Sequence, residues 1–433
     1  MAKKKIRLDS ERLGRKSKEL LDFMKKRIVG QDQALEKIAH AFEAVESGIR
    51  PKHRPILTLL FLGPSGVGKS LIPSALAEYW FNSRLGYTQI NCPDYSNGYT
   101  LSTLQGAPPG YIGFLDKSTY SEKEIRMHPY PLLSQWNIDR HHFYYLYRDK
   151  IIKTKEEIRI KVEELELEEA AFNELEIIEK GRNGKAEKTE IGKRLLATMK
   201  RLKKEISDLR EEINAYNPSH KYFSIVNFDE IEQGSEQLHK IMLSILEQGV
   251  LDLKDGRKTI FYNSIITATS NVGTDAIFDL MGKNRLGFYT SFSQLLVDDP
   301  ALHEKIRSVA IKELEKFFGD PAFLNRFDDL IVFAPLSRES LEAIFDLELN
   351  YLKKILADSG FIVSVVITPE VKKFIIDKST KKVEYGAREL KRKIDNYLRR
   401  PLASLRTTFQ LADGDSVYVS LENHKLVFDK DTN

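Results

Sequence analysis

One loop of the sequence combines glycine, lysine and serine in a spacing that can hold the phosphates of a nucleotide. Residues 63–70 read GPSGVGKS, which fits GxxxxGK[ST], and they lie between the apolar run 56–62 and a helical stretch. The glycines let backbone amides surround the phosphates, Lys69 reaches the outer ones, and Ser70 can ligate Mg²⁺. The flanking strand and helix disfavour a chance glycine turn. We therefore expect ATP to contact a run of consecutive residues: Gly63, Pro64, Ser65, Gly66, Val67, Gly68, Lys69, Ser70 and Leu71.

A second apolar strand ends in two carboxylates. Residues 225–230 read IVNFDE. Such a pair can hold a metal ion and orient an attacking water, so we expect Asp229 in the Mg²⁺ shell and Glu230 as the base that activates water. An apolar strand that ends in acids is common by chance, but the phosphate loop in the same chain favours the functional interpretation.

These loops need a parallel sheet to bring them together. The run 56–62 is apolar apart from Thr58, as is typical of a strand buried on both faces, and further buried strands are predicted over 223–228, 264–269 and 330–333. Helical segments lie between them, including two helices within 19–49 that are broken at 28–31, so the pattern predicts an α/β core. After Pro335 it predicts a smaller α+β unit, with helices near 338–358, 369–379 and 386–399 and a hairpin of strands over 416–421 and 425–428.

The segment 148–216 belongs to neither unit. It is highly charged and almost free of glycine and proline, apart from a polar break at 181–184. Beyond the break, apolar residues recur in alternating steps of four and three, which is a heptad seam, and residues before the break follow the same rhythm less regularly. We expect an antiparallel coiled-coil hairpin with arms about 45 Å long. The expected division of the chain is a basic tail and helix over 1–27, a large domain over 28–336 that contains the hairpin, and a small domain over 337–433.

Composition excludes several classes of protein. The chain has 433 residues, a single cysteine and a formal net charge of +4. One cysteine forms no internal disulfide, and the low net charge gives little support to a nucleic-acid partner. The sequence has neither an apolar stretch long enough to span a bilayer nor a secretory signal at its start, so we expect a cytoplasmic protein without a membrane partner. The basic first eighteen residues are interpreted as a solvated tail or as a contact for an acidic partner.

Several further motifs resemble those of one family. Together with the phosphate loop and the acidic strand they are similar, in content and order, to the Clp-type AAA+ unfoldases and disaggregases, particularly the second ATPase module of the two-ring members. The resemblance covers most of the chain outside the first two dozen residues and the 148–216 segment. The motifs are IVGQDQA (28–34), FLGPSGVGKS (61–70), GAPPGYIGF (106–114), FDEIEQ (228–233), TSNVG (269–273), FLNRFDD (323–329) and YGARELKR (385–392).

The resemblance implies a fold and roles for further residues. The fold would be an AAA+ P-loop NTPase core with a small α+β lid. Ile28 and Val29 would flank the adenine base. Asn271 would position the attacking water or sense the γ-phosphate. Arg326 would be an arginine finger for the neighbouring subunit, and Arg388 in the lid would touch the phosphate of its own subunit. Each arginine alone would be a surface ion pair; the motif context favours the functional role.

The resemblance also assigns a pore loop. In GYIGF, Tyr111, Ile112 and Phe114 would grip an extended polypeptide without reading its sequence, because an aromatic and branched apolar surface can press against any peptide. The alternative is a buried loop anchor. A nucleic-acid channel would more often carry Lys and Arg beside its aromatics.

The implied activity is that of an ATP-dependent unfoldase or remodelling chaperone, a homo-oligomer that is most simply a hexamer. Two alternatives stay open: a nucleotide-switched assembly platform that recruits partners through the coiled coil, and an AAA+ factor linked to nucleic acid. The 148–216 hairpin is either a docking arm or a rigid spacer. An adaptor is a further expected partner, and peptidase docking through 286–288 stays open beside the interpretation of Leu286, Gly287 and Phe288 as a buried anchor.

Overall fold

The computed structural model describes residues 12–49, 52–107, 131–141, 148–181, 189–216, 223–281, 300–319, 321–380 and 386–431. Tyr111, Ile112 and Phe114 of the predicted pore loop lie outside the described residues, as do residues 286–288. Among the helices that are described, none is both long and apolar enough to cross a membrane.

A parallel sheet forms the centre of the large domain, as the sequence predicts, and it has five strands because β2 joins the four that were expected. Its strand order is β2-β3-β6-β1-β7. Each residue of β1 and β6 is buried, because both strands lie inside the sheet and helices cover both of its faces. The strands are β1 Leu57–Leu62, β2 Thr88–Asn91, β3 Ser224–Asp229, β6 Ser264–Ser270 and β7 Asp329–Val332.

Two apolar layers sandwich this sheet. Alternate residues of β1 face opposite ways, so Leu59 and Phe61 enter one core while Leu60 and Leu62 enter the other. The first core takes in α1 Arg15–Lys25, α2 Asp32–Ser47 and α3 Leu71–Phe81; the second takes in α10 Glu236–Gln248, α11 Thr274–Leu280 and α12 Pro300–Phe318. Shorter elements complete the domain: η1 Cys92–Tyr95, η2 Gly98–Leu101, α4 Ser102–Gln105, α6 Gln135–Asp139, η4 Ile231–Gln233, the hairpin of β4 Val250–Asp252 and β5 Lys258–Ile260, and α13 Pro321–Leu324.

The small domain combines helices with a three-stranded sheet of order β10-β9-β8. Its helices match the prediction, except that the last one continues beyond residue 399. A π-helical turn over Asp395–Arg399 precedes Pro401 and lets the chain continue as a helix where the proline ring would otherwise clash. The elements are α14 Arg338–Asp358, β8 Ser364–Ile367, α15 Pro369–Thr380, α16 Gly386–Ile394, α17 Arg400–Thr407, β9 Ser416–Glu422 and β10 Lys425–Lys430.

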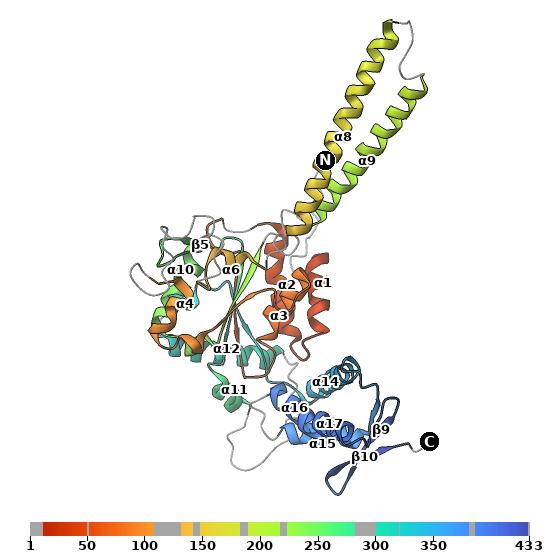
Figure 1. Ribbon diagram of the computed structural model, residues 1–433. Coiled ribbons are helices and arrows are strands. Elements are labelled where there is room, and N and C mark those ends of the chain that lie inside the picture. Colours follow the sequence, from red (N-terminus) through yellow and green to blue (C-terminus); the bar gives the residue numbers. More distant parts are fainter. Residues whose placement is uncertain are drawn as a thin grey trace, which may run out of the picture.

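The predicted coiled-coil hairpin is confirmed. Helix α8 spans Arg148–Gly181 and helix α9 spans Glu190–Tyr216, and the two arms pack side by side and project from the large domain away from the small one (Figure 1). Leu202 and Ile206 of the seam are buried between them. Ion pairs cross the seam from Lys161 to Glu205 at 2.7 Å and from Lys203 to Glu169 at 2.9 Å.

Candidate nucleotide site

The phosphate loop connects the end of β1 to the start of α3. Two of its glycines are required by the backbone. Gly63 has φ 137° and Gly68 has φ 110°, both in the region that favours glycine. A Cβ on Gly63 would lie 2.3 Å from the carbonyl oxygen of Phe333, so the loop can approach the segment after β7 only without a side chain there. Ser70 then precedes the first residue of α3.

Lys69 is buried at the centre of the loop, with 5% of its surface exposed. Its Nζ donates to the carbonyl oxygens of Gly63 at 2.5 Å and Pro64 at 2.6 Å, and to Oδ1 of Asn271 at 2.9 Å. Burial lowers the pKa of Lys69 to about 8, although nearby carboxylates, Glu232 foremost, act in the opposite direction. An ammonium group that has lost its water and faces only a few acceptors is well suited to receive phosphate oxygens.

The acidic pair at the end of β3 lies beside the phosphate loop. Ser70 Oγ donates to Asp229 Oδ1 at 3.2 Å. Thr269 holds both acids, because its hydroxyl donates to Asp229 Oδ1 and accepts a 2.9 Å bond from the backbone amide of Glu230. Glu230 itself has a left-handed backbone with φ 56°, a conformation that non-glycine residues adopt mainly where surrounding contacts enforce it.

Asn271 connects the lysine to the acidic pair. Its Oδ1 accepts from Lys69, and its Nδ2 donates to Glu230 Oε1 at 3.3 Å. The sheet register explains the proximity: Leu62 is paired with Ser270, so the residues that follow β1 and β6 emerge side by side. The backbone amide of Asn271 donates to Glu232 Oε1 at 3.0 Å.

Three residues of this site were not predicted from the sequence. Thr269 and Glu232 lie within motifs that were recognised, TSNVG and FDEIEQ, but the partners they hold became evident only from the sheet register. The third is Gln31, which is buried and joins the 28–31 turn to the segment after β7. Its Nε2 donates to the carbonyl of Ala334 at 2.8 Å, and its Oε1 accepts from the amide of Ala334 at 3.1 Å.

The two residues expected at the adenine base lie in the turn that Gln31 holds. Ile28 is buried, and its Cγ2 would be 3.3 Å from a Cβ placed on Gly68, so it packs against the phosphate loop. Val29 is half-buried. Gly30 follows with φ 75°, and a Cβ there would lie 2.2 Å from Oγ of Ser340 in α14, so the turn also contacts the small domain.

Helix α16 of the small domain contacts the phosphate loop directly. Arg388 Nη1 donates to Ser65 Oγ at 2.8 Å, and the amide of Ala387 donates to the carbonyl of Gly66 at 3.0 Å. The position of Arg388 therefore depends on how the small domain lies against the large one. A guanidinium next to this loop can form paired hydrogen bonds with phosphate oxygens.

Arg326 is not part of this cluster. Its Nη2 lies 3.1 Å from Glu247 Oε1, and its carbonyl oxygen accepts from the hydroxyl of Thr58 at 3.2 Å. Thr58 lies at the beginning of β1, whereas the phosphate loop follows the end of that strand. At ~3.3 Å per residue, Thr58 and Gly63 are roughly 16 Å apart, more than the length of an arginine side chain. Arg326 therefore lies at the opposite edge of the sheet from the Lys69 cluster.

Two family models match the chain. The model described as AAA domain (Cdc48 subfamily) matches residues 54–142 and 186–330, and the model described as C-terminal, D2-small domain, of ClpB protein matches residues 336–419. The chain belongs to the Clp-type AAA+ ATPases. The chain is 27% identical to a chaperone protein ClpB of Gloeobacter violaceus over 94% of its own length and 34% of that protein. It is 26% identical to a chloroplastic chaperone protein ClpC of Pisum sativum over 93% of its length and 32% of that protein. It thus spans about a third of the length of these curated relatives.

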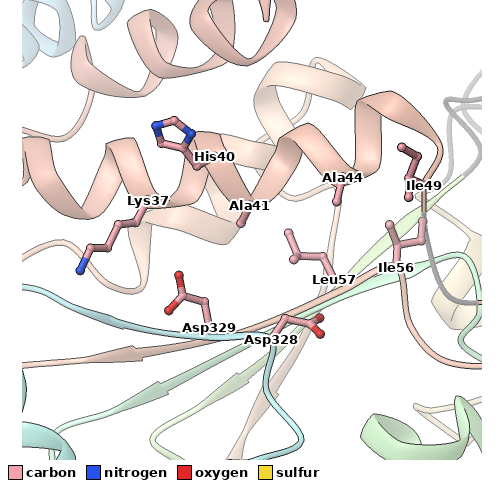
Figure 2. Close-up of a pocket in the computed structure, with 9 residues that line it drawn as sticks. All are labelled: Lys37, His40, Ala41, Ala44, Ile49, Ile56, Leu57, Asp328 and Asp329. Atoms are coloured by element: carbon pink, nitrogen blue, oxygen red, sulfur yellow. The ribbon is translucent and has the colours of Figure 1, made fainter. Parts of the chain in front are cut away.

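The AAA+ core has a shallow hollow of ≈ 390 Å³ near Arg326 and far from the phosphate loop. Figure 2 shows it between α2, which contributes Lys37, His40 and Ala44, and the beginning of β1 and β7, marked by Leu57 and Asp329. Asp328 also lines it, and Oδ1 of Asp328 accepts from Arg54 at 2.8 Å. This hollow is therefore a feature of the Arg326 edge and not of the Lys69 cluster.

The Lys69 cluster fits ATP with Mg²⁺. The loop conformation needs glycines, and the lysine is dehydrated. Glu232, whose Oε2 is buried without a hydrogen-bond partner among the described residues, favours the charged form of that lysine. The hydroxyl and carboxylate oxygens of Ser70 and Asp229 are the hard ligands that Mg²⁺ prefers. The cluster thus offers a cation for the phosphates and oxygens for the metal.

Proposed function

We propose that this chain is the ATP-hydrolysing module of a ring-forming protein remodeller. It would be a homo-oligomer, most simply a hexamer, that converts ATP turnover into movement of polypeptide. Support comes from the Lys69 cluster, from the family membership and from relatives named as chaperones. The proposed units are 1–27, a large domain over 28–336 that contains the hairpin 148–216, and a lid over 337–433.

In this proposal the residues of one subunit bind and orient the nucleotide. Ser70 and Asp229 would hold Mg²⁺, which neutralises phosphate charge when bound. Lys69 would bind the outer phosphates from within the loop and Arg388 from the small domain, and Ile28 and Val29 would contact the adenine base. The remaining contacts would come from the loop itself: Gly63, Pro64, Ser65, Gly66, Val67, Gly68 and Leu71.

The chemical step would depend on Glu230 and Asn271. Glu230 Oε1 can accept a proton from water because the group that pairs with it at 3.3 Å, Nδ2 of Asn271, is an uncharged amide and forms no ion pair with the carboxylate. Asn271 would align that water, since its amide already lies between the lysine and the carboxylate. Thr269 would fix the backbone from which both acids extend.

The position of Arg326 is the observation that carries the ring. One subunit holds the phosphate cluster at one edge of the sheet and Arg326 at the other. If Arg326 is the arginine finger, a complete site would need two subunits packed head to tail. Head-to-tail contacts close into a ring when the rotation between subunits allows it. Arg326 would then stabilise the charge that develops on the neighbour's nucleotide.

Tyr111, Ile112 and Phe114 would grip the polypeptide, an assignment that rests on the resemblance. The test is ATP-driven unfolding of a tagged fluorescent substrate. Tyr111→Ala should leave ATPase activity and abolish unfolding, whereas Tyr111→Phe keeps the aromatic surface and should retain it. Glu230→Gln should bind ATP without turnover. Normal unfolding by Tyr111→Ala would eliminate the threading mechanism.

Adding a peptidase to the same assay tests whether Leu286, Gly287 and Phe288 couple the ring to proteolysis. An adaptor is a further proposed partner.

The hairpin favours a second candidate function, a nucleotide-switched platform that recruits partners. The family match stops at residue 142 and resumes at residue 186, so the first arm interrupts it. Lys150 and Glu212 form a 3.1 Å ion pair at the base of the hairpin, so a short linker can replace residues 150–215. The platform predicts lost partners and unchanged slow ATP turnover in this deletion, without unfolding activity in either protein. Stimulation of ATP turnover by DNA at low salt would instead favour a nucleic-acid factor.

A further inference from the structure

Helix α8 carries apolar residues on two opposite sides. One side is the seam against α9, where Ile158 and Leu165 are half-buried. Ile160 and Leu167 follow these residues by two positions each, which is about 200° around a helix, so they point away from α9. Ile160 is 47% exposed and Leu167 is 71% exposed. Ile178, which is 52% exposed, extends the same outer stripe towards the tip.

The outer stripe of α8 lies in a strongly acidic surface. Between Val162 and Glu179 every charged side chain of α8 is a glutamate. Glu163 and Glu174 are exposed and flank Leu167 on its own side of the helix, away from α9. Glu163 forms an ion pair with Arg159 of its own helix at 3.0 Å. The ion pairs across the seam use other residues, such as Glu169, so pairing of the two arms does not account for the outer glutamates.

Helix α9 has the opposite charge at the same height of the hairpin. Between Ile191 and Lys204 every charged side chain is a lysine or an arginine. Lys204 follows the buried seam residue Leu202 by two positions and is exposed on the side away from α8. Ala197 and Lys200 are exposed on that outer side too. Ala197 leaves room for apolar side chains of another chain. The aliphatic stems of the surrounding lysines can cover those side chains and place their ammonium groups against carboxylates.

The acidic stripe and the basic side therefore lie on opposite sides of one hairpin. Because they face away from each other, the acidic stripe and the basic side of one hairpin cannot pair with each other within one chain. They can pair between copies that stack in the same direction. Such heterologous contacts repeat and close with the symmetry of a ring. Both arms also emerge between α6 and β3, at the beginning of β3, and Arg326 lies at the beginning of β1 and β7, at the same end of the parallel sheet. The hairpin is thus rooted at the edge that faces another subunit in the proposed ring.

We propose that hairpins of adjacent subunits pack side by side, with the outer stripe of α8 from one copy (Ile160, Leu167 and Ile178, with Glu163 and Glu174) against the basic side of α9 (Ala197, Lys200 and Lys204) from the next. The occupant of the stripe is a second copy of this chain. The inference rests on the ring of the proposed function, and it assigns the hairpin to contact between subunits.

Cysteine crosslinking of the full chain tests this contact. The single native cysteine, Cys92, is buried, so mild oxidation reports only on introduced thiols. Leu167→Cys combined with Ala197→Cys should give disulfide-linked multiples of the chain in the presence of ATP and the Glu230→Gln substitution. The two thiols face away from each other within one hairpin, so a link within a chain is not expected. Leu167→Cys combined with Glu211→Cys is the matched control, because Glu211 lies near the base of α9 and should not crosslink.

Charge reversal then tests the chemistry of the contact. Glu163→Lys with Glu174→Lys should reduce the crosslinked fraction at least tenfold, and adding Lys200→Glu with Lys204→Glu should restore it. Crosslinking of Leu167→Cys alone would show that α8 packs against α8 and would overturn the proposal. Absence of crosslinks in the double-cysteine variant would overturn it too. If that variant still forms oligomers by light scattering and hydrolyses ATP without the Glu230 substitution, the proposed function survives and only the hairpin contact fails.

Discussion

Lys69 and Asn271 are joined by a 2.9 Å hydrogen bond from Nζ to Oδ1, although 202 residues separate them in the sequence. The same Asn271 side chain donates through Nδ2 to Glu230. One amide therefore connects the group proposed to bind phosphate with the group proposed to activate water. A change in the position of Lys69 on binding phosphate can therefore change the position of Glu230 through this amide.

Replacement of Asn271 should separate binding from turnover. Asn271→Ala removes the alignment of Glu230 but leaves the phosphate loop intact, so we expect ATP affinity within about threefold of wild type and a loss of about 10²-fold in kcat. Steady-state ATPase assays and titration with a fluorescent nucleotide measure the two quantities. Asn91→Ala, at the end of β2 on the same edge of the sheet, is the control and should change neither. An equal loss in affinity and in kcat would contradict the assigned role.

Much of the fold could be predicted because its elements have strong local patterns. β1 is apolar apart from Thr58, β6 is rich in Ile and Thr, and α8 and α9 carry heptads, so both the sheet and the hairpin followed from the sequence. β2 and β8 were not predicted, since each has only four residues and alternates between buried and more exposed positions. Such a short alternation also occurs in loops.

The residues of the site also differ in how far the sequence could predict them. Lys69, Asp229 and Asn271 could be named because each belongs to a motif at the end of a strand. Gln31 could not be assigned a role, because its partner Ala334 lies 303 residues away and only the packing of α2 against β7 brings them together. Thr269 is similar: a threonine in a strand is unremarkable until the register places it beside Asp229.

Two inactive variants should restore each other if Arg326 acts on the neighbouring subunit. The Glu230→Gln variant keeps Arg326 but lacks the base. The Arg326→Ala variant keeps the base but supplies no arginine to the nucleotide of its neighbour. In an equal random mixture, about a quarter of the junctions combine an intact Glu230 with an intact Arg326. The exposed ion pair of Arg326 with Glu247 costs little to break, so it does not prevent Arg326 from reaching the nucleotide of the neighbouring subunit.

ATPase activity of the mixture, after subunit exchange, is the measurement. We expect it to exceed the sum of the separate variants severalfold. A mixture of Glu230→Gln with the double variant Glu230→Gln/Arg326→Ala contains no complete junction and should stay inactive. If the first mixture is equally inactive, Arg326 does not act between subunits.

Burial of Lys69 predicts how ATP affinity depends on pH. The pKa of Lys69 is lowered to about 8 in the free protein, and bound phosphates would raise it by adding negative charge. The lysine is charged before binding below pH 8, so the Kd for ATP should be constant there. Above pH 8 binding must take up a proton, so Kd should rise towards tenfold per pH unit until the pKa of the complex is reached.

Nucleotide titrations between pH 6.5 and pH 9.5 test this dependence. Lys69→Arg is the control, because a guanidinium stays charged over the whole range. It should bind more weakly than wild type and with a Kd that does not change between pH 8 and pH 9.5. A wild-type Kd that is equally flat would show that Lys69 keeps its proton in the free protein.

Gly386 should couple the lid to the phosphate loop. It begins α16 with φ 47°, and a Cβ there would lie 2.8 Å from the carbonyl oxygen of Gly66 and 3.0 Å from that of Ser65. These are backbone atoms of the loop and cannot move aside as a flexible side chain would. Gly386→Ala should therefore displace Ala387 and Arg388 from the loop, raise the KM for ATP about tenfold or more, and leave the lid folded.

Gly360→Ala is the matched control for Gly386→Ala. Gly360 lies in the same domain with φ 70°, and a Cβ placed on it would meet nothing within 4 Å among the described residues. Both variants carry the backbone cost of a positive φ, so equal KM values for the two would show that the contact between Gly386 and Gly66 does not control nucleotide binding.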